Sequence, residues 1–167
     1  MKPVNLKHAA IKWALAGVLV AISTPAFAVL GDNAASVLTD QARMKGTLNS
    51  VDRTTYVMHE ITAPTGAKVR EYVSPAGQVF GIAWEGQFPP NLEQLLGPYY
   101  QQAQQAMAEQ KSAGQGSEPQ APARRRGPAI INTPGLVLVQ SGHMHSYHGQ
   151  AYIPQLVPQG VAAGDIR

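Results

Sequence analysis

The fold is decided by residues 54–84, which read TTYVMHEITAPTGAKVREYVSPAGQVFGIAW. The stretch contains three runs rich in β-branched and aromatic residues, the composition that favours strands. They are residues 56–62, 69–73 and 79–84. Pro64-Thr65-Gly66 and Ser74-Pro75-Ala76-Gly77 separate them, and short turns of this kind join antiparallel neighbours. The stretch therefore predicts a three-stranded antiparallel meander.

Alternation assigns the two faces of this meander, because successive residues of a strand point to opposite sides. In the middle run the two sets are Val69, Glu71 and Val73 on one face, and Arg70 and Tyr72 on the other. Neither set is purely apolar. We therefore expect one covered face and one face partly open to solvent.

Outside the meander, periodicity and turn residues predict helices and two further strands. The expected helices are residues 34–45, 91–96 and 99–111, and the expected strands are 136–140 and one beginning at 151–153. Ser141-Gly142 is expected to turn or bulge the chain. The class is then α+β, a predominantly antiparallel sheet of a three-strand meander plus two C-terminal strands, with helices on one face. Residues 112–128 are rich in Gly, Ser, Pro and Gln and predict a flexible internal linker.

Residues 1–28 have the three parts of a secretory signal peptide. Three lysines, Lys2, Lys7 and Lys12, precede an uncharged apolar stretch at 13–22, and Ala26-Phe27-Ala28 follows. That apolar stretch is shorter than the ~20 residues of a membrane-spanning helix. We expect cleavage after Ala28, a single small domain at 29–167 without a transmembrane span, and a periplasmic or secreted destination.

The composition narrows the classes of partner and cofactor. The three signal lysines account for the formal net charge of +3, so the remaining chain is formally neutral and gives no sign of nucleic-acid binding. The chain has no cysteine, which excludes disulfides and thiolate metal ligands.

Several segments are similar to a bacterial family of exported proteins. They are 57–61, 69–80, 83–86, 92–97, 141–144 and 149–152. With them the chain resembles the family called domain of unknown function 2844, and the part from Arg70 to Gly77 is the most specific. The resemblance implies export but no activity, and it assigns no catalytic or binding residue. His145 and His148 stand where the family has other residue types.

The segment His143-Met144-His145-Ser146-Tyr147-His148 is the one cluster of metal-capable side chains. Imidazoles at His143 and His145 share a face in an extended chain, and His148 could join them to hold copper, nickel or zinc. The alternative is that these residues are packed or exposed polar groups. No other cofactor is expected.

Two other surfaces could bind a partner. Tyr72 and Trp84, with Tyr56 and Phe80, could line a recognition face, but aromatic residues of strands also pack in cores. The triplet Arg124, Arg125 and Arg126 could attract an anionic lipid, polysaccharide or protein, or simply be solvated.

The residues favour a non-enzymatic role, although they do not exclude an enzyme. His59, Glu60 and Glu71 could supply acid and base groups, but they could equally form cross-strand pairs. No nucleophile elbow, zinc-protease motif or phosphate loop is present. We expect an exported envelope protein that acts as an interaction or structural module, its partner an envelope protein or polymer. The alternative is a small-ligand or metal-binding periplasmic protein that uses His143, His145 and His148.

Overall fold

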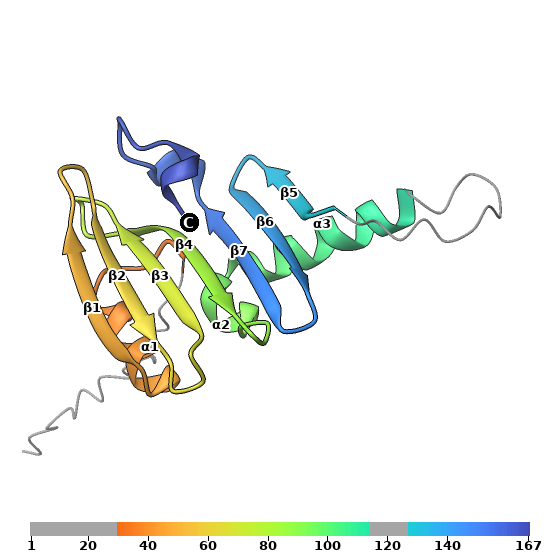
Figure 1. Cartoon of the computed structure of the whole chain (residues 1–167). Coiled ribbons are helices and arrows are strands. Elements are labelled where there is room, and N and C mark those ends of the chain that lie inside the picture. The colour runs from red at the N-terminus through yellow and green to blue at the C-terminus, as the bar shows by residue number, and fades with distance from the viewer. Residues whose placement is uncertain (1–29, 114–126) are drawn as a thin grey trace, which may run out of the picture.

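A computed structural model describes residues 30–113 and 127–167 of the chain. They form one seven-stranded antiparallel sheet in the order β1-β2-β3-β4-β7-β6-β5, with the helices behind it in the view of Figure 1. The strands are β1 Thr47–Asp52, β2 Val57–Thr62, β3 Lys68–Val73, β4 Val79–Gly86, β5 Ala129–Thr133, β6 Leu136–His143 and β7 Ser146–Tyr152. The helices are α1 Ser36–Met44, α2 Leu92–Leu96 and α3 Tyr99–Ala113, followed near the C-terminus by the short 3-10 turns Pro154–Leu156 and Ala163–Asp165.

Turn chemistry fixes the central hairpins as the sequence predicts. The Ala63 amide donates to the Ala67 carbonyl across the β2–β3 turn, and the Ser74 amide donates to the Gln78 carbonyl across the β3–β4 turn, both at 2.8 Å. Gly66 and Gly77 take positive φ in these turns, a conformation that other residues rarely adopt. The two turns set the order of the meander, and a bulge between Tyr72 and Val73 shifts the register of β3 against β4.

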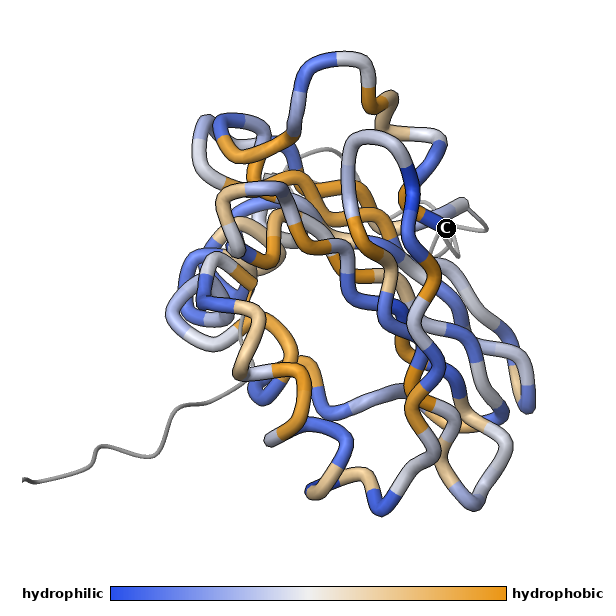
Figure 2. The backbone as a smooth tube through the Cα atoms, turned by 90° about the vertical axis from the view of Figure 1, so that its left-hand side faces the viewer, coloured by the Kyte–Doolittle hydropathy of each residue, from blue (hydrophilic) through white to orange (hydrophobic). Residues whose placement is uncertain are grey.

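The main core lies between the sheet and the three helices. Val69 and Trp84 are paired on β3 and β4, and they pack with Val37 of α1, Leu96 of α2 and Ala103 of α3. Figure 2 shows the helices as a separate layer on one side of the sheet. This arrangement confirms the predicted α+β class with its helices on one face.

A smaller cluster forms on the opposite face of the sheet. Tyr72, Phe80 and Ala83 are buried there with Ile166 from the C-terminal segment. The aromatic rings of Tyr56, Tyr72 and Phe80 lie 5.6–6.1 Å apart between centroids, in tilted and edge-on contacts. The C-terminal segment therefore covers part of the face that the helices leave open.

The structure corrects three details of the prediction. The strand expected to begin at 151–153 instead begins at Ser146 and ends at Tyr152. The sheet has two further strands, β1 and β5, which form its two edges. Ser141-Gly142 does not turn the chain, because β6 continues to His143 and the turn lies at Met144 and His145. Of the predicted linker, residues 112–113 belong to α3 and 127–128 precede β5, while 114–126 lie outside the described residues.

Candidate functional site

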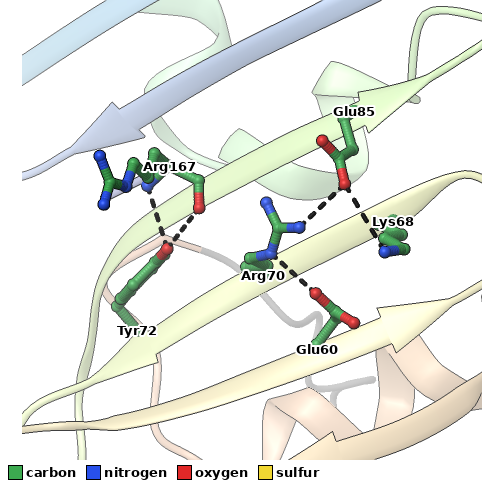
Figure 3. Close-up of polar contacts among 6 residues, drawn as sticks. All are labelled: Glu60, Lys68, Arg70, Tyr72, Glu85 and Arg167. Atoms are coloured by element: carbon green, nitrogen blue, oxygen red, sulfur yellow. Dashed lines mark hydrogen bonds and ion pairs between the residues drawn. The ribbon is translucent and has the colours of Figure 1, made fainter. Parts of the chain in front are cut away.

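The two aromatic candidates, Tyr72 and Trp84, lie in the core. Their exposed fractions are 1% and 4%. The Tyr72 hydroxyl donates to the Arg167 carbonyl at 2.8 Å and accepts from the Arg167 amide at 3.0 Å (Figure 3). Tyr72 thus anchors the C-terminal end of the chain, and both rings are almost fully buried.

The three histidines lie in and beside the β6–β7 turn. His143 ends β6 and pairs with Ser146, whereas His148 of β7 pairs with Ser141 of β6. His145 occupies the turn itself with a φ of 66°, so the extended geometry that would place it on one face with His143 is absent. Among residues 30–113 and 127–167, no three or more His, Asp or Glu side chains gather closely enough to hold a metal ion.

Two of the predicted features lie outside the described residues. They are the arginine triplet, Arg124, Arg125 and Arg126, and the signal peptide with its cleavage site after Ala28. Their roles remain predictions. None of the helices within the described residues is long and apolar enough to cross a membrane.

The possible acid and base residues do not converge on one point. Strand alternation places His59 and Glu71 toward the helices and Glu60 on the other face. Glu60 accepts a 2.8 Å bond from Arg70 Nε, and Glu85 accepts one from Arg70 Nη2 at 2.8 Å (Figure 3). The paired carboxylates raise the pKa of Arg70 in spite of its partial burial, which acts in the opposite direction. Glu60 is therefore part of a cross-strand ion pair.

Glu71 instead meets a second carboxyl group, Asp40 of α1, beneath the helices. Their exposed fractions are only 2% and 1%. Gln94 of α2 donates to Asp40 Oδ1 at 2.5 Å, while Asp40 Oδ2 and both Glu71 carboxyl oxygens are buried and accept no hydrogen bond within the described residues. Two adjacent buried carboxylates cannot both be ionised at low cost, so a shared proton is the arrangement that satisfies them.

Burial sets the protonation of this pair. It raises the pKa of Glu71 to about 8, with the nearby Asp40 charge acting in the same direction, and it also raises the pKa of Asp40. His59 stands opposite Glu71 on β2, and burial lowers its pKa. A neutral imidazole supplies no counter-charge, so the pair keeps its proton at neutral pH. The carboxyl pair, together with Gln94, connects α1, α2 and β3 and has a structural role.

The edges of the sheet carry the remaining candidate surface. At β1 the Arg53 amide donates to the Tyr56 carbonyl at 2.9 Å, which sets the phase of the β1–β2 pairing. Because bonded and non-bonded pairs alternate in antiparallel strands, the amides and carbonyls of Leu48, Ser50 and Asp52 then point away from the sheet. Within the described part of the chain, no hydrogen bond reaches these outward groups.

At the opposite edge a helix covers part of β5. The Ile153 amide donates to the Phe80 carbonyl at 3.0 Å, and alternation from this bond through β7 and β6 turns Ile130 and Asn132 of β5 outward. Gln110 of α3 donates its Nε2 to the Ile130 carbonyl at 2.7 Å. The β5 edge is therefore partly closed, whereas the β1 edge is open.

Comparison with known proteins finds one family, and its match covers nearly all the residues of the fold. The model of the family described as protein of unknown function (DUF2844) matches residues 26–166. The chain belongs to this family. No curated protein and no solved structure matches the DUF2844 chain.

Proposed function

We propose that this DUF2844 protein is exported to the cell envelope and acts there as a non-enzymatic interaction module. Its partner adds an extended strand to the outer edge of β1. The observation that supports this most is the open row of backbone groups at Leu48, Ser50 and Asp52. Export itself rests on the signal-peptide pattern of residues 1–28.

The chemistry of the β1 edge selects the kind of partner. Outward amides and carbonyls at alternate residues are matched by another extended backbone, the mode of recognition known as strand addition. Natural proteins usually protect an edge strand with proline, inward-pointing charges, bulges or a covering element. Strand β1 reads TLNSVD, and its one charged residue is the last, Asp52. A strand of six residues without such protection suits an extended segment of an envelope protein.

The test replaces one outward amide. Ser50→Pro removes an N–H that points away from the sheet, and proline is tolerated on that side of an edge strand. Ser50→Ala is the matched control, because both variants lose the 2.7 Å contact of Ser50 Oγ with His59 Nδ1, but only the proline removes the amide. Asn132→Pro makes the same change at the β5 edge.

The assay is retention of a crosslinked partner from envelope extract, with identification by mass spectrometry. We expect Ser50→Pro to lower retention at least tenfold, and Ser50→Ala and Asn132→Pro to retain the same partner as the unchanged protein. Circular dichroism checks that each variant folds, and Asp52→Pro at the strand end is the substitute if Ser50→Pro does not. Equal retention by the folded proline variants at β1 and β5 would contradict the proposal.

A further inference from the structure

A half-open hollow of about 430 Å3 lies at the end of the sheet where α1 stops and β4 runs out toward α2. Its volume is within the range of about 300–1,000 Å3 that small-ligand sites occupy. The C-terminal end of α1, the β2–β3 turn, the ends of β3 and β4 and the segment leading into α2 all contribute to it. Its lining includes Lys45, Lys68, Val69, Trp84, Glu85, Phe88 and Leu95.

The body of this hollow is apolar. Val69, Trp84 and Leu95 are buried and present part of the main core to the opening. Phe88 stands at its wall with an exposed fraction of 62%, next to the rigid pair Pro89-Pro90. An aromatic ring that remains largely in water beside an apolar opening gains free energy when a ligand covers it.

The rim of the hollow is cationic. Lys45 and Lys68 both line it, against the single carboxylate of Glu85. Lys68 lies 3.8 Å from Glu85, and both side chains are well exposed, so this pair is weak. Lys45 makes no ion pair with any residue in the described ranges. One positive charge at the rim is therefore available to a ligand.

Lys45 also holds a backbone position that favours glycine. It follows α1 with a φ of 50° and a ψ of 34°, and its amide bonds the last carbonyls of the helix. Glycine is the usual residue at such a left-handed helix end, and Gly46 comes only one position later. A lysine here costs conformational energy without a described ion-pair partner that would explain it.

We propose that this hollow binds a small amphipathic organic anion, a single alkyl chain that ends in a carboxylate. The chain lies against Phe88, Trp84 and Leu95, and the carboxylate meets Lys45 at the rim. The apolar lining together with the unpaired cation selects this class over uncharged or cationic ligands of the same shape. None of Leu48, Ser50 and Asp52 lines the hollow, so this binding is separate from strand addition.

The first experiment is isothermal titration calorimetry of the full chain with decanoate, below the concentration at which decanoate forms micelles. Decanol and decyltrimethylammonium share the alkyl chain, and they replace the anion with a neutral and a cationic group. We expect decanoate to bind about tenfold more tightly than decanol, and the ammonium compound to bind most weakly.

Two variants separate the apolar and the charged contributions. Phe88→Ala should lower decanoate affinity about tenfold, whereas Leu38→Ala, at a residue with a similar exposed fraction of 60% but outside the hollow, should leave it unchanged. Lys45→Gly should raise the thermal midpoint, because glycine suits the left-handed backbone, while it weakens decanoate binding and removes the preference over decanol. A merely structural lysine would not move stability and affinity in opposite directions.

The outcomes are distinct. Tighter binding of decanoate that depends on both Phe88 and Lys45 supports the proposal. Absence of binding, equal affinity for the three alkyl compounds, or affinity that Phe88→Ala and Lys45→Gly leave unchanged would overturn it. Ser50→Pro should not alter decanoate affinity, so failure of strand addition and failure of this site can be told apart.

Discussion

The two edges of the sheet differ in the helix that stands behind each and in how it is attached. Near β1, α1 is joined to the sheet through the buried carboxyl pair Asp40 and Glu71 and leaves the outer edge uncovered. Near β5, α3 is attached by neutral amides, as Gln102 Nε2 donates to Thr133 Oγ1 at 2.8 Å and Gln110 Nε2 donates to the outward carbonyl of Ile130. The β1 end is therefore open and attached to its helix through titratable groups, whereas the β5 end is partly closed and attached through neutral ones.

The largest change in the free energy of unfolding should come from raising the pH. The unfolded chain releases the Glu71 proton near pH 4.5, whereas the native state holds it up to about pH 8. The native state therefore binds more protons between these values, and stability falls as pH rises through that interval. We expect a loss on the order of a few kcal/mol by pH 9, measured by urea unfolding at a series of pH values.

Glu71→Gln tests the origin of that loss. The amide cannot ionise, so most of the fall in the free energy of unfolding between pH 5 and 9 should disappear. Gln102→Ala is the control at the other end of the sheet. It should cost about 1 kcal/mol through its lost hydrogen bond and keep the full pH dependence. A pH profile that is unchanged by Glu71→Gln would show that another group carries it.

Opening the β5 edge should have a smaller effect on stability, but it should cause the protein to self-associate. Gln110→Ala frees the outward carbonyl of Ile130, and Ile130 is itself exposed. Because an open, apolar edge strand pairs with other chains, we expect concentration-dependent self-association in sedimentation equilibrium. Gln104→Ala on the same helix is the matched control, since Gln104 donates to the Tyr100 hydroxyl instead. If neither variant associates more than the unchanged protein, Gln110 does not protect this edge.

The central strands of the sheet were easier to predict from the sequence than the edge strand β1. The strands at 57–62, 68–73 and 79–86 are flanked by Pro-Thr-Gly and Pro-Ala-Gly turns and are rich in β-branched and aromatic residues, so their pattern is strong. Strand β1 is exposed on most of its length, and its apolar residues are only Leu48 and Val51. An edge strand with little to bury shows no clear alternation of apolar and polar residues, so the sequence pattern does not predict β1.

The candidate site was less predictable, for reasons of distance and backbone conformation. The sequence left Glu71 as an acid–base group or a member of a cross-strand pair, but its neighbour is Asp40, which no local spacing connects to it. The β6–β7 turn contains neither glycine nor proline, and His145 itself takes the positive φ. The turn therefore lacks the usual sequence signal. Ser141-Gly142 was the stronger turn signal, and it proved to be part of a strand. The outward phase of β1 follows from the Arg53–Tyr56 bond, which only the structure supplies.

Site-specific photo-crosslinking in intact cells tests the open β1 edge most directly. Asn49 of β1 and Asn132 of β5 are both exposed residues of edge strands, and a photoreactive amino acid replaces each in turn. We expect a crosslinked partner from position 49 and at least tenfold less from position 132. Crosslinking that is equal at the two positions, or stronger at 132, would contradict the claim that β1 is where this protein meets its partner.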